Sequence, residues 1–450
     1  MKTKKLLCVT LMGSALCVAS SLVLAKADAA DVARLGQDLT PFGAQMAGNA
    51  GGTIPAWTGG LTQAPAGYVP GKGYVDPYAS DKPLYTITAA NMGQYADQLS
   101  DGYKAMLRKY PGYKMIVYPT HRPVALPASE YAQIKKEAGT VTLADDGAGM
   151  LNYEKTSVPF PVPASARELL YNHTLRYRQG GYQYYPTEMV VKPGGNFTVI
   201  HRTVNMVMAS ALGNPEPNRL FYYMDKVTGP DSVAGQQSLL HEPLDQVKEP
   251  RLAWQYNPGQ RRVLRAPELG YDSVDGLSDG LRTYDMYDMY SGAPDRYDWK
   301  LLGKKEMIVP YDTYKLADHS LQYSDIVKPE HLNQDLIRYE THRVWVVEAT
   351  LKPGARHIYA KRVFYIDEDN WAILAADLFD GHGELWRVQE AHTLQRYDVL
   401  SSIAISDVAY DLQARSYVVN GLANQEKPER FGVHSTFQDF SPAALRRAGN

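Results

Sequence analysis

Cysteine is almost absent from this chain of 450 residues, and its two cysteines, Cys8 and Cys17, both lie near the N-terminus. If that terminus is removed on export, the remaining chain carries no thiol. This excludes a disulfide scaffold, a cysteine nucleophile, a thiolate zinc site and an iron–sulfur cluster. The chain must then rest on a large hydrophobic core, for which its length is ample.

Charge of one sign and catalytic signatures are lacking as well. Lysine and arginine number 47 against 49 aspartates and glutamates, without a basic stripe, so we expect no nucleic-acid partner. Nucleophile-elbow, P-loop, zincin and dinucleotide motifs do not occur in a fitting context. His241-Glu242 precedes Pro243, which cannot continue a zincin helix. We therefore expect neither an enzyme nor a cofactor.

The N-terminus has the pattern of a secretory signal peptide. Lys2, Lys4 and Lys5 precede an apolar run, and Ala27-Asp28-Ala29 offers small residues for cleavage. We predict a cleaved signal over residues 1–29 and a periplasmic protein, with an association with the outer membrane left open. Leu16 before Cys17 disfavours lipidation, and the polar interruptions of the apolar run disfavour an uncleaved anchor.

Beyond residue 29 the composition and residue spacing of the chain change three times. Residues 30–85 are rich in glycine and proline, which predicts an extended arm laid over the body. Residues 86–180 show helical spacing that starts at Thr88, breaks at 100–102 and returns near 128–138 and 164–177. The remainder is predicted to form strands over 181–425, an inserted loop or lid at about 268–335, and a polar tail at 426–450.

Residues 338–392 predict four consecutive strands that are apolar on both faces. A turn centred on residues 368–369 would place Ile366 opposite Trp371. An antiparallel sheet with one solvated face alternates apolar and polar residues. This sheet must instead be covered on both faces, by the protein or by a ligand.

Tyrosine is unusually frequent, with 33 copies against 9 phenylalanines and 6 tryptophans. Tyrosine suits half-wet pocket walls, although it also populates antiparallel sheets in general. Tyr284, Tyr287 and Tyr290 recur every third residue, as in a short helix or 3₁₀ segment with an aromatic face. This segment is predicted to be either a lid or a surface helix packed by its tyrosines.

Large aromatic side chains are the candidate ligand contacts, because each buries about 150–250 Å². We expect one face of the 338–392 sheet to line a cavity, with the 284–290 segment closing over it, while the other face packs helices of residues 88–177. The candidates are Trp254, Tyr284, Tyr287, Tyr290, Trp345, Tyr359, Tyr365, Trp371 and Trp386.

Polar side chains in the same sheet have a plain structural interpretation. His342, His357, His382, Glu384 and His392 are the elements of a conceivable metal site, but histidines on separate strands are more often hydrogen-bonded sheet residues. We therefore predict no metal. Arg338, Glu340, Arg343, Glu348, Arg362 and Arg387 are predicted to form a cross-strand ion network, and only geometry would identify a glycosidase-like carboxylate pair.

The segment 338–369, RYETHRVWVVEATLKPGARHIYAKRVFYIDED, also resembles the signature region of a bacterial family of secreted proteins of unknown function. The resemblance extends to residues 48–61, 76–99, 296–316 and 396–422. That family is grouped with the LolA/LolB-like carriers and described as outer-membrane lipoprotein-sorting proteins. It implies an α+β fold, in which a large curved antiparallel sheet forms a half-open barrel with helices packed on one side.

The function implied by this resemblance is a periplasmic carrier for a lipid, acyl chain or sterol-like ligand. The family's gene neighbourhoods imply a resistance-nodulation-division exporter or an outer-membrane protein as partner. Two alternatives from other classes stay open. One is an exported hydrolase acting on polysaccharide or ester, and the other is a structural subunit of an envelope complex. A deep apolar cavity, converging catalytic groups or an exposed apolar patch would separate the three.

Overall fold

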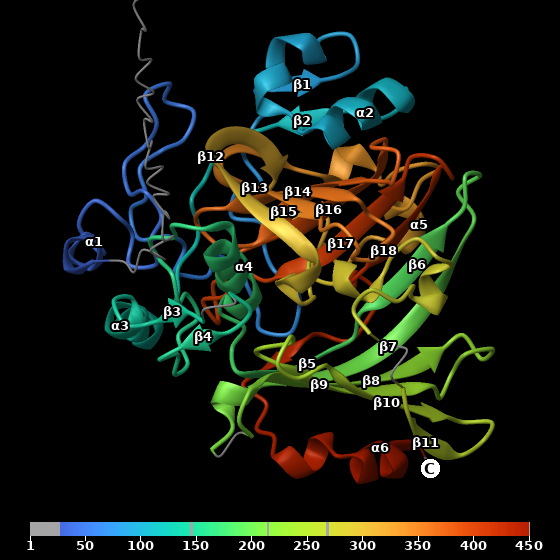
Figure 1. Ribbon diagram of the computed structural model, residues 1–450. Coiled ribbons are helices and arrows are strands. Elements are labelled where there is room, and N and C mark those ends of the chain that lie inside the picture. The colour runs from blue at the N-terminus through green and yellow to red at the C-terminus, as the bar shows by residue number, and fades with distance from the viewer. Residues whose placement is uncertain (1–27, 145–146, 214–215, 267–269, 450) are drawn as a thin grey trace, which may run out of the picture.

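The computed structural model describes residues 28–144, 147–213, 216–266 and 270–449. Both cysteines and nearly all of the predicted signal peptide, residues 1–29, lie outside these ranges. One large, strongly curved sheet forms the centre of the molecule, and helices flank it (Figure 1). The predicted α+β class and the curved antiparallel sheet are confirmed.

The first part of the sheet, here called the meander half, is a run of sequential antiparallel strands. It consists of β12 (Tyr297–Pro310), β13 (Tyr339–Leu351), β14 (Lys361–Asp367), β15 (Ile373–Phe379), β16 (Leu385–Thr393), β17 (Ala404–Asp411) and β18 (Ser416–Asn420). The four strands predicted within residues 338–392 are confirmed as β13 to β16.

The second part, here called the hairpin half, continues the same sheet, because β18 pairs with β6. It consists of β6 (Thr187–Val191), β7 (Phe197–Met208), β8 (Arg219–Gly229), β9 (Gln237–Pro243), β10 (Leu252–Asn257) and β11 (Arg262–Arg265). Within the described residues no pairing joins β11 to β12, so the sheet stays open.

Short strands extend the sheet at two points. β2 (Met115–Val117) meets the start of β13 in parallel and pairs with β1 (Tyr85–Ile87), whereas β5 (Gly181–Tyr184) joins β7 to β19 (Arg430–Phe431). The first half of β7 pairs with β6 and the second half with β5. The sheet therefore bends along β7, which Figure 1 shows as a long curved band. β3 (Thr142–Leu143) and β4 (Met150–Leu151) form a separate hairpin.

Six α-helices of the described residues surround the sheet, on both faces of its meander half and outside its hairpin half. They are α1 (Ala29–Ala33), α2 (Asp101–Lys109), α3 (Ala128–Glu137), α4 (Ala166–Leu175), α5 (Tyr323–Ile326) and α6 (Pro442–Gly449). Met106 of α2 packs in one cluster with Val344 and Val388, whereas Leu169 of α4 packs on the opposite face with Ile373. Successive strand residues face opposite sides, so apolar residues at both parities need these two covers.

Short 3₁₀ segments punctuate the loops: η1 (Met92–Gln98), η2 (Ala209–Ala211), η4 (Gly276–Ser278), η5 (Tyr284–Met286), η6 (Pro294–Arg296), η7 (Gln334–Leu336) and η8 (Phe437–Phe440). The helix predicted to start at Thr88 begins instead with η1 after Asn91. The predicted break is confirmed, since the Ser100 side chain caps α2 by accepting the Tyr103 N–H. No helix of the described ranges is long and apolar enough to span a membrane.

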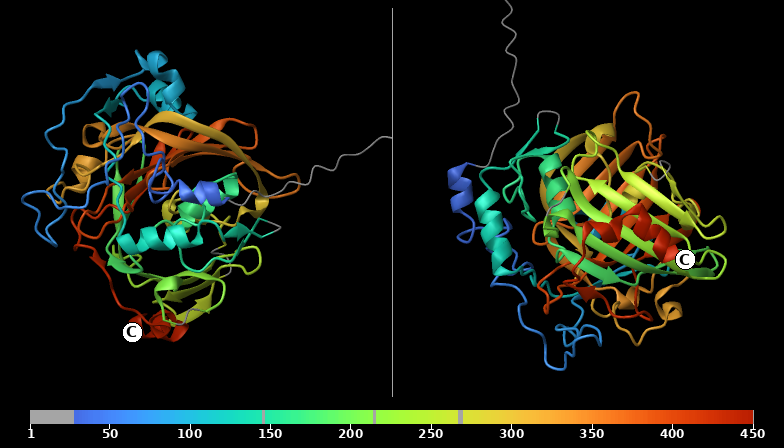
Figure 2. Two further views of the ribbon diagram at one scale, coloured as in Figure 1. Left: turned by 90° about the vertical axis from the view of Figure 1, so that its left-hand side faces the viewer. Right: turned by 90° about the horizontal axis from the view of Figure 1, so that it is seen from below.

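The C-terminal segment, predicted as a polar tail, is folded and covers the outer face of the hairpin half. α6 lies across the outer face of this half, as Figure 2 shows from below. Leu445 of α6 and Phe440 of η8 are buried against Tyr222 and Leu239. The prediction missed this because the apolar residues of the segment, Phe431, Phe437, Phe440 and Leu445, are spaced among many polar ones.

Two further predictions were wrong in detail. Residues 297–310, placed in an inserted loop at about 268–335, form the edge strand β12. The turn after β14 is longer than predicted, and Ile366 pairs with Ile373 rather than with Trp371. Trp371 itself adopts a left-handed conformation with φ of 58° and buries its ring in the turn.

Candidate functional site

A cavity of about 630 Å³ lies against the inner face of the hairpin half. This volume falls within the range of about 300–1,000 Å³ that is typical of small-molecule sites. Its walls come from the hairpin half, from residues 275–291, from the start of β17, and from the segments 68–74 and 420–431. The cavity is therefore assembled from parts that are far apart in the sequence.

The hairpin half supplies one wall through the alternation of its strands. Phe221, Tyr223, Asp225 and Val227 of β8 all line the cavity. The residues between them point outwards, where Tyr222 packs under α6. Arg202 and Met206 of β7, and Ser238 and Leu240 of β9, extend the same wall. Side chains alternate along a strand, so these strands have an outer face that points away from the cavity and an inner face that combines aromatic and charged groups.

Residues 275–291, here called the partition, separate the cavity from the meander half. Tyr284 and Tyr287 line the cavity, whereas Tyr290 is buried against the meander half. The chain reverses between them because residues 288 and 289 both adopt left-handed conformations, with φ of 54° and 67°. The predicted 3₁₀ segment is confirmed as η5, but its three tyrosines do not share a face.

The N-terminal arm contributes a third wall. The hydroxyl of Tyr68 donates to an Asp398 carboxylate oxygen at 2.5 Å, and the hydroxyl of Tyr74 donates to the other oxygen at 3.1 Å. Arg396 lies close by and pairs with Glu429 at 2.5 Å. All five side chains line the cavity. The arm predicted over residues 30–85 therefore reaches the site through its tyrosines.

Four carboxylates converge beside the wall of the cavity and form what we call the carboxylate cluster. Its members are Glu188 of β6, Asp225 of β8, Asp275 of the partition and Asp407 of β17, and Arg202 and Arg282 lie among them. The Arg202 guanidinium lies 2.6 Å from Asp225 and 3.8 Å from Glu188. Arg282 pairs with Glu188 and lies 3.4 Å from Asp275.

Asp407 is the most weakly paired member of this cluster. Its nearest cation is Arg282 at 3.5 Å, and the Asn420 amide donates to it at 2.9 Å. Burial raises the pKa of Asp407 to about 6, and the pairing with Arg282 only partly offsets that effect. Burial also raises the pKa of Tyr223 and Tyr287 well above the usual value, so both phenols keep their protons, and the Tyr287 hydroxyl donates to Asp275 at 2.9 Å.

The nine aromatic residues predicted as ligand contacts separate into two groups. Tyr284 and Tyr287 line the cavity. The ligand face predicted on the 338–392 sheet is not found there, because none of the residues 338–392 lines the cavity. The other seven candidates, Trp254, Tyr290, Trp345, Tyr359, Tyr365, Trp371 and Trp386, pack within the core clusters or at their margins.

Most of these seven hold the fold together through a ring and a polar tip. The Tyr365 hydroxyl donates to Asp377 at 2.9 Å, and the Trp371 indole donates to the Phe42 carbonyl at 3.0 Å. Trp254 lies edge-on to His241 on the outer, α6 side, with its ring centroid 4.9 Å away. Their burial against other parts of the chain, and not their size, decides this role.

Sequence reasoning missed the wall residues Arg202, Phe221, Tyr223 and Asp225 of the hairpin half. A signal was present: the odd-numbered positions of the run 221–227 combine two aromatic rings, a carboxylate and a valine. Alternation of this kind predicts one face that is neither dry nor fully solvated. The prediction instead placed the ligand face on the meander, whose strands are apolar on both faces.

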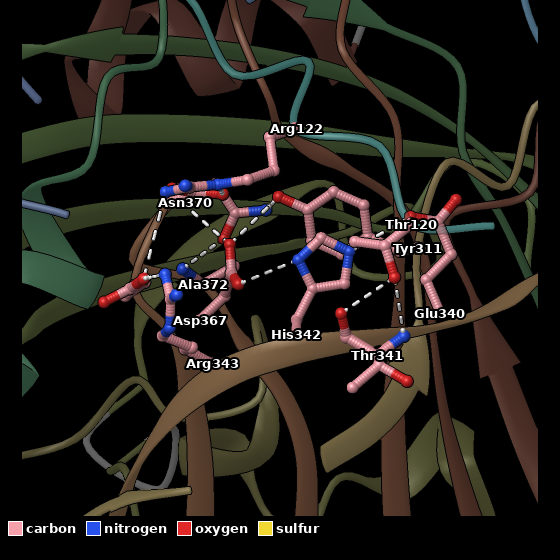
Figure 3. Close-up of polar contacts among 12 residues, drawn as sticks. Thr120, Arg122, Tyr311, Glu340, Thr341, His342, Arg343, Asp367, Asn370 and Ala372 are labelled. Atoms are coloured by element: carbon pink, nitrogen blue, oxygen red, sulfur yellow. Dashed lines mark hydrogen bonds and ion pairs between the residues drawn. The ribbon is translucent and has the colours of Figure 1, made fainter. Parts of the chain in front are cut away.

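A second polar cluster occupies the start of β13, and Figure 3 shows it in close-up. His342 stacks on Tyr311 with ring centroids 3.7 Å apart, and its ring nitrogens lie 3.1 Å from Glu340 and 3.7 Å from Asp367. Tyr311 donates to Asp367 at 3.0 Å. A histidine between two carboxylates has the composition of an acid–base site.

This cluster is sealed inside the protein. Glu340 and Asp367 are 0% exposed and His342 is 1% exposed. A neighbouring space of about 20 Å³, lined in part by Asp369 and Asn370, has room for about one water molecule. Arg122 and Arg343 close the cluster by pairing with Asp369 and Glu368. A substrate therefore has no path to these groups, and the cluster joins β12, β13 and the turn after β14.

The polar residues singled out from the sequence find separate partners. Arg338 pairs with Glu340, Arg343 with Glu368, Arg362 with Asp285 and Arg387 with Asp411. The predicted single network across these strands is thus replaced by local pairs. In the described part of the chain, no group of three or more His, Cys, Asp or Glu side chains is placed to hold a metal.

The chain belongs to the DUF1329 family of proteins of unknown function, whose model matches residues 86–446. It is 48% identical over 456 residues to an uncharacterized protein of Pseudomonas aeruginosa, with all of both chains covered. A DUF1329 family protein from Desulfovibrio piger is similar at 16% identity and a TM-score of 0.41, covering 59% of this chain and 91% of its own. A LolA superfamily protein from Nitrosomonas europaea is similar at 13% identity and a TM-score of 0.38, covering 62% and 98%.

Proposed function

We propose that this member of the DUF1329 family is a non-enzymatic binding protein that carries an amphipathic small molecule in the cavity of the hairpin half. The observation that carries the proposal is the composition of the wall. Met206, Phe221 and Leu240 offer apolar contact, whereas Arg202 and Asp225 offer charge in the same space. A ligand with an apolar body and a polar group fits such a wall.

A carrier is favoured over a hydrolase by where the reactive groups lie. The histidine–carboxylate cluster around His342 is closed to substrate, and the carboxylates near the cavity are engaged with arginines. We place the carrier in the periplasm, on the support of the signal-like pattern in residues 1–29.

Binding of a fluorescent amphiphile tests the proposal directly. We expect delipidated protein to bind the uncharged probe N-phenyl-1-naphthylamine saturably, with one site per chain. Ser238→Trp places an indole in the cavity from β9 and should weaken binding at least about tenfold, which is about 1.4 kcal/mol. Mass spectrometry of organic extracts from protein purified from its own envelope should show a co-purified amphiphile.

Thr228→Trp is the matched control, because Thr228 lies on the exposed, outward face of the neighbouring strand β8. This variant should bind the probe as tightly as the original protein. Absence of saturable binding would overturn the proposal, and so would a folded Ser238→Trp variant with unchanged affinity.

A further inference from the structure

Negative charge exceeds positive charge on one side of the cavity. The carboxylate cluster holds four carboxylates and two arginines, Arg202 and Arg282. Asp288, farther along the partition, has Arg176 and Arg178 as its own partners. Five carboxylates thus face four arginines in this region, and the excess lies in the carboxylate cluster. Buried charge without a counter-ion is costly, so the cluster favours a cation that enters from the cavity.

Glu188 supplies an unused acceptor within the cluster. Its side chain is 0% exposed, and its Oε1 has no hydrogen-bond partner among the described residues. The other carboxylate oxygen, Oε2, lies 3.4 Å from the Tyr287 hydroxyl and 3.8 Å from Arg202, both of which line the cavity. Buried carboxylate oxygens nearly always accept a hydrogen bond. Glu188 does not itself line the cavity, so this oxygen adds uncompensated negative charge behind the wall that Tyr287 and Arg202 form.

Aromatic rings stand beside the same carboxylates. Tyr284 and Tyr287 stack with their ring centroids 6.2 Å apart, and Tyr223 lines the wall next to them. Tyr287 already receives a cation on its ring, since the Arg282 guanidinium lies 3.7 Å from the ring centroid. Tyrosine rings attract cations through their electron-rich faces. These rings thus complement a positive group in the same way as the carboxylates.

We propose that the ligand carries a cationic nitrogen, held between the carboxylate cluster and the rings of Tyr223 and Tyr287, with its apolar part along Met206, Phe221 and Leu240. This inference rests on the proposed carrier function, because it names the ligand class for the same cavity. A bare metal ion fits poorly, since Arg202 and Arg282 lie among the carboxylates and no described group is placed to hold a metal.

Three probes of equal chain length test the inference: dodecylammonium, dodecanol and dodecanoate, each below its micelle concentration at pH 7. Displacement of N-phenyl-1-naphthylamine reports their affinities. We expect dodecylammonium to bind at least about tenfold more tightly than dodecanoate. Asp407→Asn should weaken binding of dodecylammonium about tenfold and leave dodecanol unchanged. Asp377→Asn is the matched control, because Asp377 is a buried carboxylate of the meander half, away from the cavity.

The outcomes separate this inference from the carrier function. If the fluorophore itself does not bind saturably, the carrier function fails, and if it binds but dodecylammonium does not displace it, the cationic ligand alone is overturned. If dodecanol binds but dodecanoate binds as tightly as dodecylammonium, the cationic ligand is overturned and the carrier stands. The preference is measured on the unmodified protein, so it decides the question even if Asp407→Asn does not fold. A folded Asp407→Asn variant that keeps the full preference would also contradict the inference.

Discussion

The meander half and the hairpin half belong to one curved sheet, yet their inner faces differ in kind. On the meander half, Phe364, Ile373 and Ala376 are 0% exposed beneath α4 and Tyr290. On the hairpin half, Phe221 and Tyr223 are half-buried and border open space. Strands that are apolar on both faces therefore indicate core, and strands with a mixed inner face indicate the site.

The difference follows from which segments cover each half. The partition packs one side on the meander half and leaves the other side, with Tyr284 and Tyr287, to the cavity. The inner face of the hairpin half carries Arg202, Asp225 and Ser238, whose burial beneath an apolar cover would be unfavourable. The fold thus leaves space beside this mixed face of the hairpin half and packs the apolar face around Phe364 and Ile373 closely.

The largest effect should come from truncating a side chain on the buried, apolar face of the meander half. Phe364→Ala removes a fully buried ring that packs on Tyr290 and Trp299, with ring centroids 5.5 and 6.0 Å away. We expect the free energy of unfolding to fall by about 3–5 kcal/mol. Chemical denaturation measures this loss. A loss under about 1 kcal/mol would mean that this face of the meander half is not the closely packed core described above.

Asp377 offers a pH test of the same half. Burial raises the pKa of Asp377 to about 6, although it accepts hydrogen bonds from Tyr365, Ser100 and Gly102. The folded protein therefore holds a proton that the unfolded chain has released, and stability falls as the pH rises from about 4 to above 6. A shift of roughly two pKa units corresponds to about 3 kcal/mol.

Asp377→Asn removes this titration, so the stability difference between the two proteins is the quantity to follow. The original protein loses up to about 3 kcal/mol of stability between pH 4 and pH 7. The free energy of unfolding of the variant, relative to that of the original protein, should therefore rise by this amount over the same range. Denaturant unfolding at pH 4, 5, 6 and 7 measures the difference. Parallel stability curves would show that Asp377 titrates normally in the folded state.

Trp371→Phe separates ring packing from hydrogen bonding. The substitution keeps an aromatic ring in the turn after β14 but removes the indole N–H that donates to the Phe42 carbonyl. An unsatisfied buried carbonyl costs about 1–3 kcal/mol, and we expect a loss in that range. Probe binding should not change, because Trp371 lies outside the cavity. A selective loss of probe binding would show that Trp371 contributes to the ligand site after all.

Phe221→Ala is the counterpart of Phe364→Ala on the cavity wall and should have the smallest effect on stability. The ring of Phe221 is half-buried and borders the cavity, so we expect a loss of about 1 kcal/mol or less in the free energy of unfolding. Affinity for N-phenyl-1-naphthylamine should fall, because the ring forms part of the apolar wall. Equal destabilisation by the two substitutions would remove the distinction between the halves.

Local patterns in the sequence predicted much of the fold. The four strands within residues 338–392 and the helices α3 and α4 all lie where periodicity and turn residues placed them. The turn after β14 shows the limit of that reasoning. Its length depends on Trp371, whose left-handed conformation is held by contacts with Phe42, more than 300 residues away. The pattern of residues next to Trp371 in the sequence gives no information about a contact with so distant a residue.

What the sequence determined by itself was the set of elements and the covering of both faces of the meander half, because period two and period 3.6 are properties of neighbouring residues. Tertiary structure alone decided where the cavity lies. Its walls bring Tyr68 of the arm, Tyr223 of β8 and Asp398 into one space. Whether a tyrosine lines a pocket or fills a core depends on which distant segment covers it, and chain folding over hundreds of residues sets that cover.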